Sequence, residues 1–203
     1  MIKILALGDL HGSPIAPELS RIMDLSEPDF ILQVGDYSCY NVSWPFPLYF
    51  ITGNHEVMNG YKAPIDKIKA GKCILPNNNN MLTAGLQNIM GINVVALPSV
   101  PMPGAAPGPA LFTPEDYDAC MTVKEPVDVF VSHGCGFPFW VYIGNQRKQV
   151  EDQAVTKLLK HLNPKYAISG HNHLYEKIEQ DGIQLIRLGC NRPDAYHLLI
   201  FDA

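Results

Sequence analysis

Short apolar runs, each bounded by glycine, proline, aspartate or asparagine, recur along the chain and set its pattern of hydrophobic and polar positions. Runs of this length, rich in β-branched and aromatic residues, are typical of strands. The pattern predicts strands at residues 2–7, 30–34, 48–52, 81–90, 92–98, 127–132 and 166–169, with a hairpin around Gly91. Later runs are predicted to form an antiparallel meander that turns at the sequence QDG, with strands at 173–178, 183–188 and 196–201.

Longer segments with helical spacing separate several of these strands. Residues 14–25 are predicted to form a helix with Ser13 as its N-cap and Pro14 at its first position. Residues 150–162 carry the apolar stripe of an amphipathic helix, which ends at an Asn-Pro pair. Weaker helical patterns occur at 58–69 and 114–123. Strands that alternate with helices indicate an α/β protein.

Two segments lack any periodicity. Residues 76–80, with the sequence PNNNN, are predicted to be a plain solvated loop. Residues 98–109 contain five prolines, which exclude regular structure and indicate either a surface excursion or a lid over a site. A domain linker is disfavoured because the part that follows is too small for a core of its own. We therefore expect a single domain over residues 1–203.

Five of the ten predicted strands end in short blocks of glycine, aspartate, asparagine or histidine. The blocks at these ends read LGDLHG, VGDYS, TGNHE, SHGCG and SGHNH. In open α/β sheets, the loops at the carboxyl ends of the strands gather in one crevice. We therefore expect the polar side chains of these five blocks to converge on one site.

The side chains at these ends are all oxygen or nitrogen donors of the kind that bind metal ions: Asp9, His11, Asp36, Asn54, His55, His133, His171 and His173. Imidazole, carboxylate and amide together suit hard or borderline divalent ions. The donors suffice for two ions and are too many for one tetrahedral zinc. In Asp9-x-His11 and His171-x-His173, the spacing places both side chains on one side of an extended segment. None of the cysteines is needed.

The ordered set of blocks resembles the calcineurin-like metallophosphoesterase family. The family pattern of D-x-H, G-D, G-N-H-D/E, H-G and G-H-x-H corresponds to residues 9–11, 35–36, 53–56, 132–134 and 170–173. Each block is weak alone, but the complete set in order covers nearly the whole chain. The resemblance implies an α/β (α+β) fold, a four-layer αββα sandwich of two mixed sheets flanked by helices, with a dimetal site at the carboxyl ends of strands.

The resemblance also assigns roles to individual residues. It implies one metal ion on Asp9, His11 and His173, a second on Asn54, His133 and His171, and Asp36 as the bridge between them. His55 becomes the catalytic residue that binds the scissile phosphate or protonates the leaving oxygen. The implied cofactors are two divalent ions, first Mn²⁺, with Fe²⁺, Zn²⁺ or Ni²⁺ as alternatives. The implied reaction is hydrolysis of a phosphoric ester by a hydroxide that bridges the two metal ions.

Departures from related patterns argue against a protein phosphatase, and the chain is more similar to small phosphodiesterase-like members of the family, which favours phosphodiesters over monoesters as substrates. The block GDYSCY lacks the further aspartate and arginine of serine/threonine phosphatases, and TGNHE lacks the preceding arginine. Two other functions are considered. One is a non-catalytic, metal-binding partner scaffold on the same fold, which the presence of Asn54 and His55 disfavours. The other is a nuclease acting on short nucleic acids through the aromatic and basic segment 137–148.

Candidate substrate residues lie in irregular segments. Arg192 and Arg147 are candidates for a phosphate contact, because arginine binds phosphate oxygens in a bidentate way. A surface salt link explains Arg192 equally well. Glu56 is expected to support the site in preference to acting as a general base.

The composition limits the kinds of binding partner that the protein can have. The 203 residues have a formal net charge of −5, which argues against a long footprint on nucleic acid. A small phosphorylated substrate remains compatible, because bound cations reverse the local charge. Five scattered cysteines, an odd number, indicate a reducing compartment. The apolar N-terminal run is too short for a membrane span, so we expect a soluble, cytoplasmic protein with no membrane contact.

Overall fold

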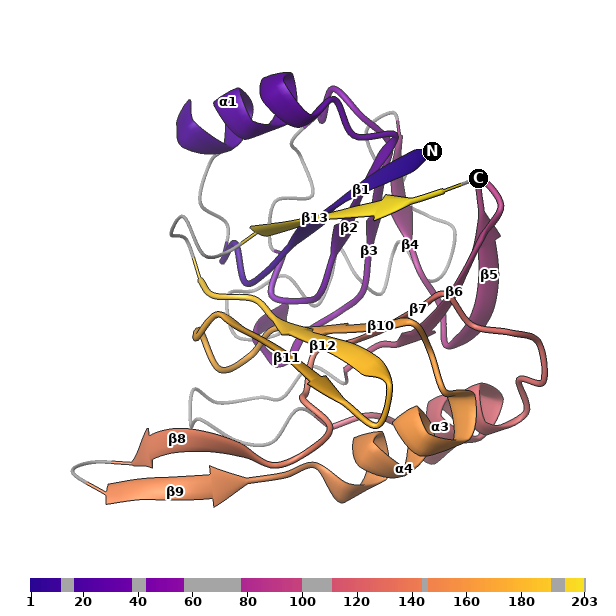
Figure 1. The fold of residues 1–203 in the computed structure, drawn as a ribbon, viewed down its shortest axis with the longest axis vertical. Coiled ribbons are helices and arrows are strands. Elements are labelled where there is room, and N and C mark those ends of the chain that lie inside the picture. The colour runs from indigo at the N-terminus through magenta and orange to yellow at the C-terminus, as the bar shows by residue number, and fades with distance from the viewer. Residues whose placement is uncertain are drawn as a thin grey trace.

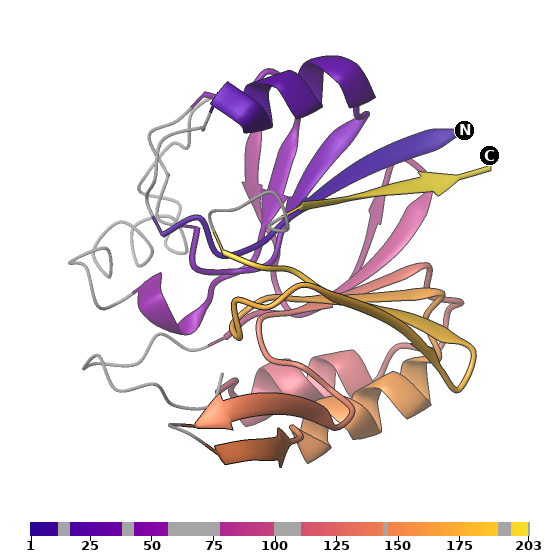
Figure 2. The same ribbon diagram turned by 60° about the vertical axis from the view of Figure 1, so that its left-hand side comes forward.

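Two mixed β-sheets pack face to face and form the middle layers of the molecule (Figures 1 and 2). The computed structural model describes residues 1–11, 17–37, 43–56, 78–99, 111–143, 146–190 and 196–202. Helix α1 (Pro17–Ser26) covers the outer face of one sheet, and helices α3 (Pro114–Met121) and α4 (Gln153–Leu162) cover the other (Figure 2). The predicted α/β fold, a four-layer αββα sandwich, is confirmed.

The first sheet has five strands in the order β13-β1-β2-β3-β4. These are β13 (Tyr196–Phe201), β1 (Ile2–Leu7), β2 (Phe30–Gln33), β3 (Leu48–Phe50) and β4 (Asn79–Met81). Neighbours from β1 to β4 run parallel, and β13 pairs antiparallel with β1. The parallel strands therefore all end on the same edge of the sheet.

The second sheet has six strands in the order β11-β12-β10-β7-β6-β5. These are β11 (Glu176–Gln180), β12 (Ile183–Arg187), β10 (Tyr166–Ser169), β7 (Val129–Ser132), β6 (Ile92–Leu97) and β5 (Gly85–Ile89). The four central strands are parallel, and the edge strands β11 and β5 are antiparallel to their neighbours. The predicted hairpin around Gly91 is confirmed as β5–β6.

Apolar side chains fill all three interfaces between the layers. Between the sheets, Ile4 and Leu32 meet Val131, Ile168 and Ile186, and none of the five is more than 1% exposed. Continuous apolar runs are expected for parallel strands covered on both faces. Burying one such side chain stabilises the fold by roughly 1.5–3 kcal/mol. The sandwich is therefore rigid enough to fix the loops at its strand ends.

Helix α4 begins later than its sequence pattern predicts. The N-cap of α4 is Asp152, whose side chain accepts hydrogen bonds from the amides of Ala154 and Val155. The predicted start at 150 was wrong because Val150 belongs to a strand. Helix α1 begins at Pro17 within the described chain, and the predicted cap at Ser13 lies outside it. The predicted helix at 58–69 and residues 100–109 of the proline-rich segment also lie outside the described residues.

The C-terminal strand has a different partner from the predicted one. Strands β11 and β12 pair antiparallel, as expected, but β13 pairs with β1 in the other sheet. The prediction of a three-stranded meander was therefore wrong for its last strand, β13. This crossing places both chain ends on neighbouring strands (Figure 1).

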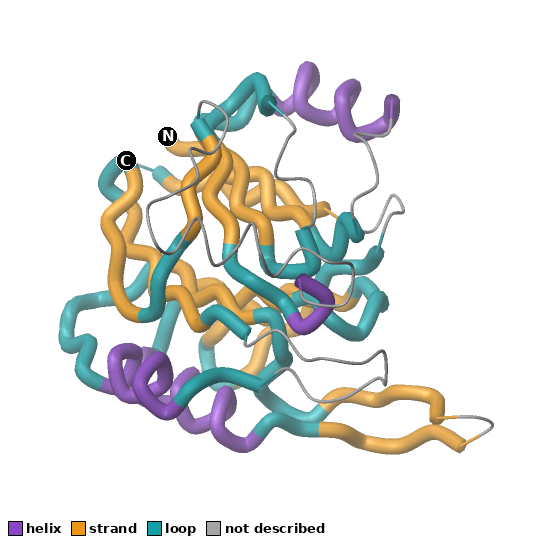
Figure 3. Tube along the Cα trace, turned by 180° about the vertical axis from the view of Figure 1, so that it is seen from behind, coloured by secondary structure: helices purple, strands orange, loops and turns teal. Residues whose placement is uncertain are grey.

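Two further segments are more regular than the sequence analysis predicts. Strands β8 (Phe139–Ile143) and β9 (Gln146–Val150) form a two-stranded hairpin that extends from the body, visible from behind in Figure 3. Within the predicted solvated loop, residues 79 and 80 belong to edge strand β4, and Asn79 is buried. In the described residues, no helix is long and apolar enough to cross a membrane.

Candidate dimetal site

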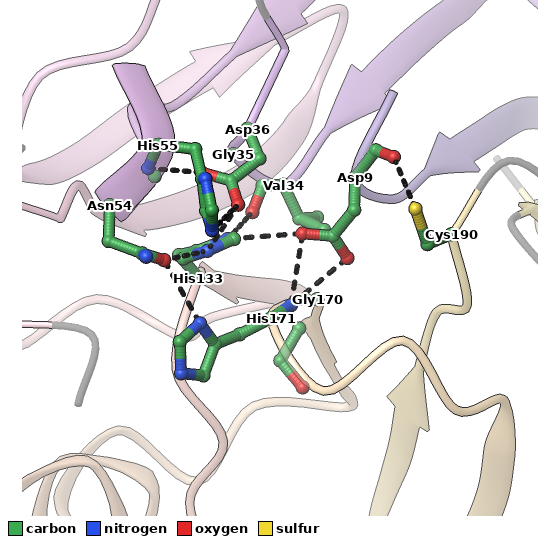
Figure 4. A network of polar contacts seen from close by, with 12 residues as sticks. Asp9, Val34, Gly35, Asp36, Asn54, His55, His133, Gly170, His171 and Cys190 are labelled. Carbon is green, nitrogen blue, oxygen red and sulfur yellow. Dashed lines mark hydrogen bonds and ion pairs between the residues drawn. The ribbon is translucent and has the colours of Figure 1, made fainter. Parts of the chain in front are cut away.

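Loops that follow five strands of the two sheets bring their polar side chains together in one cluster (Figure 4). Strands β1, β2 and β3 of the first sheet lead to Asp9 and His11, to Asp36, and to a 3₁₀ turn at Asn54–Glu56. Strands β7 and β10 of the second sheet lead to His133 and to His171 and His173. All eight donors predicted from the sequence therefore lie in one region, as expected.

Backbone hydrogen bonds tie these loops to one another. The amide of His11 donates to the Asp36 carbonyl at 2.8 Å, and the amide of Gly170 donates to the His133 carbonyl at 3.2 Å. Across the two sheets, the amide of His171 donates to both carboxylate oxygens of Asp9 at 3.1 and 3.0 Å. The donors are thus held by main-chain contacts, which preorganises the site.

The carboxylate of Asp36 lies at the centre of the cluster and is fully buried. Its Oδ1 accepts a hydrogen bond from the His55 amide at 2.8 Å. Its Oδ2 is buried without a hydrogen-bond partner among the described residues. Around that oxygen, the Nε2 atoms of His133, His11 and His55 lie at 3.3, 3.9 and 3.9 Å. A buried carboxylate oxygen that lacks a donor is costly unless a cation compensates it.

The other donors fall into two groups on either side of Asp36. In one group, the Oδ1 of Asn54 lies 2.8 Å from His133 Nε2 and 3.0 Å from His171 Nδ1. In the other, the Nε2 atoms of His11 and His173 lie 3.2 Å apart. Each group converges on a point that a metal ion can occupy, and Asp36 borders both.

Asp9 lies differently from the grouping that the resemblance implies. Its Oδ1 is 3.8 Å from His133 Nδ1, and its carboxylate forms a close group with Asp36 and His133. It is buried, whereas His173 is exposed at the mouth of the site. In this structure the Asp9 carboxylate therefore lies beside His133 and Asp36.

Burial and mutual charge shift the protonation of the cluster. Burial raises the pKa of Asp9 to about 7, although the nearby His133 opposes the shift. Burial would also raise the pKa of Asp36, but the charge of the adjacent His133 and the hydrogen bond from the His55 amide prevail and lower that pKa to about 2. Against its own burial, the pKa of His133 is raised to about 9 by Asp36. The buried carboxylates of Asp9 and Asp36 thus favour a positive charge between them, which a divalent cation would supply.

The prediction that the paired donors lie on extended backbone was wrong. An extended backbone was expected to place Asp9 beside His11 and His171 beside His173. Instead, His11, His171 and His173 have φ values of 48°, 71° and 54°, in the left-handed region. Non-glycine residues rarely adopt this conformation, and its concentration at functional sites is well known. Asp36, with a φ of 52°, shares it.

Glu56 supports the site from behind. It is fully buried, and its carboxylate accepts hydrogen bonds from the amides of Asp36, Tyr37 and Gly53 at 3.2, 2.6 and 2.5 Å. These contacts fix the loop after β2 against the turn after β3. The expected supporting role agrees with this geometry.

Close packing at Gly53 gives a testable consequence. A Cβ atom there would lie 2.2 Å from Asp36 Oδ1 and 2.4 Å from the Asp36 amide nitrogen, so Gly53→Ala must displace that loop. We expect a loss of about 1–3 kcal/mol from overpacking, equivalent to a fall of about 2–12 °C in melting temperature. The stabilisation gained on adding Mn²⁺ should fall as well. Thermal unfolding with and without Mn²⁺ measures both.

Gly91→Ala is the matched control for this prediction. Gly91 has a φ of 90° in the β5–β6 turn, and a Cβ there meets no atom within 4 Å. Gly91→Ala should lower the free energy of unfolding by about 1–2 kcal/mol, because alanine is strained in the left-handed backbone conformation. It should leave the response to Mn²⁺ intact. Equal responses to Mn²⁺ in the two variants would contradict the packing argument.

The candidate substrate residues are not placed in the site. Arg192 lies outside the described residues. Arg147 lies on β9, opposite Tyr142, and the structure describes the backbone there without the side chains. Both assignments stay predictions.

Cys190 also lies at the site and was not among the donors predicted from the sequence. Its Sγ lies close to the imidazole nitrogens of His11 and His173. A signal for it existed, because LGC follows strand β12 in the same way that the other donor blocks follow their strands.

The fold and the site define a class of protein: an αββα sandwich with a cluster of histidines and carboxylates where strands of both sheets end. The particular family follows from a direct comparison. The family model for calcineurin-like phosphoesterases matches residues 2–175, and the chain belongs to this family. No curated protein matches the sequence.

Solved structures share the fold at low sequence identity. Phosphopantetheinyl hydrolase from Mycobacterium tuberculosis is 12% identical with a TM-score of 0.57, over 98% of this chain and 96% of that one. GAP50, the anchor in the inner membrane complex of Plasmodium, is 12% identical with a TM-score of 0.53, over 93% of this chain and 71% of that one. These similarities support the αββα architecture.

Proposed function

We propose that the protein is a metal-dependent phosphoesterase that hydrolyses phosphoric esters, with phosphodiesters preferred over monoesters. One observation carries the proposal: a buried carboxylate oxygen of Asp36 without a hydrogen-bond partner in the described chain, surrounded by imidazole nitrogens from three loops. Membership of the calcineurin-like phosphoesterase family supports it.

The donor chemistry fits two divalent cations. Asn54, His133 and His171 would hold one ion, and His11 and His173 the other, with Asp36 shared and Asp9 beside them. Mixed oxygen and nitrogen donors suit Mn²⁺, Fe²⁺, Zn²⁺ and Ni²⁺, and Mn²⁺ is our first candidate for this set. When bound, such ions supply Lewis-acid activation of a water molecule and of the phosphoryl oxygens at neutral pH.

The residues of the chain have separate tasks in this proposal. Asp36 and Asp9 neutralise the bound charge, and burial strengthens this interaction because the local dielectric is low. His55 is 31% exposed in its side chain and lies at the edge of the cluster, open to a substrate. It binds the phosphate or donates its proton to the leaving oxygen, typically worth about 10²–10⁴-fold in rate.

The preference for diesters rests on missing arginines. The blocks after β2 and β3 lack the arginines that serine/threonine phosphatases carry there. Arginine binds phosphate oxygens in a bidentate way, so its absence favours the ester with the lower negative charge. The expected partner is a small phosphorylated substrate.

Activity after metal exchange tests the proposal. Protein stripped with a chelator and reloaded with Mn²⁺ should hydrolyse bis-p-nitrophenyl phosphate faster than p-nitrophenyl phosphate. The chelated protein should be inactive towards both and regain activity on titration with Mn²⁺. A lack of turnover with Mn²⁺, Fe²⁺, Zn²⁺ and Ni²⁺ would overturn the activity. A faster reaction with the monoester would overturn only the preference.

A further inference from the structure

Cys190 lies at the exposed side of the cluster, in the loop that follows β12. The Sγ of Cys190 and one ring nitrogen each of His11 and His173 all lie within 4.8 Å of one another. Cys190 is half-buried, in contrast to the fully buried Cys120 and nearly buried Cys135. The thiol is therefore next to two candidate ligands and accessible to an ion.

The position of this thiol is fixed by the fold. A Cβ added at Gly8 would lie 2.6 Å from the Gly189 carbonyl oxygen, so the loop before Cys190 packs directly on the end of β1. The Sγ of Cys190 donates a hydrogen bond to the Asp9 carbonyl at 3.2 Å (Figure 4). Two loops from different sheets thereby hold Cys190 beside the Asp9–His11 segment.

The two histidines already have the spacing of a shared ion. Their Nε2 atoms are 3.2 Å apart. Tetrahedral zinc with Zn–N bonds of about 2.0–2.1 Å places two imidazole nitrogens about 3.3 Å apart. A thiolate in the same shell lies about 3.6 Å from each nitrogen, given a Zn–S bond of about 2.3 Å. The three donor atoms, which all lie within 4.8 Å of one another, are close to this spacing.

A second observation points to a cation at this place. The buried Oδ2 of Asp36, which lacks a hydrogen-bond partner in the described residues, lies 3.9 Å from His11 Nε2. The fully buried Asp36 thus offers a carboxylate oxygen next to His11, a member of the same group as the thiol.

We infer that Cys190 is a metal ligand, which completes a four-donor set with His11, His173 and Asp36 for one ion of the centre. The metal–sulfur bond replaces the S–H bond, the hydrogen bond to Asp9 is released, and the proton passes to solvent. Thiolate is a soft donor, so at this one position it favours Zn²⁺ or Co²⁺ over the Mn²⁺ expected from the oxygen and nitrogen donors alone. The inference rests on the proposed metal centre and is independent of which ester is hydrolysed.

Co²⁺ spectroscopy on the 203-residue chain tests this assignment. Co²⁺ bound by a thiolate shows sulfur-to-cobalt charge-transfer absorption in the near ultraviolet, separate from its visible ligand-field bands. We expect the wild type to show both, and Cys190→Ser to lose the charge-transfer band while it keeps the ligand-field bands. Cys120→Ser is the matched control, because Cys120 is a buried residue of α3 whose Sγ donates a hydrogen bond to the Ala96 carbonyl, and it should keep both bands.

Two further measurements distinguish a Cys190 thiol that binds the metal ion from one that only lies near it. In wild type, Zn²⁺ should protect Cys190 from alkylation, read by peptide mass spectrometry. In Cys190→Ser, the ratio of Zn²⁺ to Mn²⁺ affinity should fall at least tenfold, measured by calorimetry. Ligand-field bands without charge transfer in the wild type would overturn the role of Cys190 and leave the metal centre in place. A failure to bind Co²⁺ at all would overturn both.

Discussion

Asp36→Asn is expected to lower kcat/KM for bis-p-nitrophenyl phosphate by about 10³-fold and to weaken metal uptake. The carboxylate of Asp36 borders both donor groups, and its buried Oδ2 has no hydrogen-bond partner in the described chain. An amide keeps the shape but supplies no charge. Each tenfold fall in rate corresponds to about 1.4 kcal/mol, so a 10³-fold fall corresponds to the loss of about 4 kcal/mol of charge stabilisation.

Thermal stability gives a readout of Asp36→Asn that does not depend on turnover. A ligand at 100 times its Kd stabilises the folded state by about 2.7 kcal/mol, equivalent to about 5–11 °C in a protein of this size. Wild type should show this gain with Mn²⁺, and Asp36→Asn should show little of it.

Asp128→Asn is the matched control, because Asp128 lies before β7 and pairs with Lys165 at 2.8 Å, away from the site. It should keep both activity and the Mn²⁺ response. A full Mn²⁺ response in Asp36→Asn would show that Asp36 is not a ligand.

Local sequence signals were sufficient to predict most of the fold and the convergence of the site. Buried strands such as 30–34 and 166–169 are continuous apolar runs closed by glycine, and a parallel arrangement sends all their ends to one edge. The donor at each end could therefore be listed before any contact was known. Glycine next to the donor was a second signal, and Gly53 shows why, since no side chain fits between it and Asp36.

Pairing between distant strands could not be predicted in the same way. The alternating pattern of residues 196–201 indicates a strand with one exposed face, which any sheet edge satisfies. Its partner is β1, at the other end of the chain. In contrast, the β8–β9 hairpin had a local signal that was overlooked. A Gly-Asn pair separates two five-residue runs at 139–143 and 146–150, a typical hairpin connection.

The detailed geometry of the donors was also beyond the sequence. Left-handed backbone at His11, Asp36, His171 and His173 is not encoded by these residue types, which prefer other conformations. It is imposed by contacts between loops, such as the amide of His171 on the Asp9 carboxylate. For the same reason, the approach of Cys190 to His11 depends on how two sheets pack and could not be read from spacing.

His55→Ala is expected to lower kcat by about 10²–10⁴-fold while metal affinity is retained. The imidazole of His55 lies at the edge of the cluster, with its Nε2 3.9 Å from Asp36 Oδ2, and its ring contacts that of His11 edge to face. It therefore faces a substrate that reaches the ions, whereas the ligands of both groups remain in His55→Ala. The Mn²⁺-induced gain in melting temperature should equal that of wild type.

Substrates with different leaving groups distinguish proton donation by His55 from phosphate binding by His55. A p-nitrophenolate leaves without much help from an acid, whereas a phenolate or an alkoxide needs the proton. We expect His55→Ala to lose more activity towards phenyl than towards p-nitrophenyl diesters, since general-acid catalysis follows Brønsted behaviour. An equal loss with both leaving groups would assign His55 to phosphate binding alone.

The same variant distinguishes an enzyme from a metal-binding scaffold. The exposed His161, in the last turn of α4, provides the control His161→Ala, which should leave turnover unchanged. If the hydrolysis of both esters is unchanged in His55→Ala as well, the turnover does not arise at this site, and a partner-binding role on the same fold becomes the better explanation. A selective loss in His55→Ala places the chemistry at the junction of the two sheets, because only there do His55 and the buried Asp36 meet.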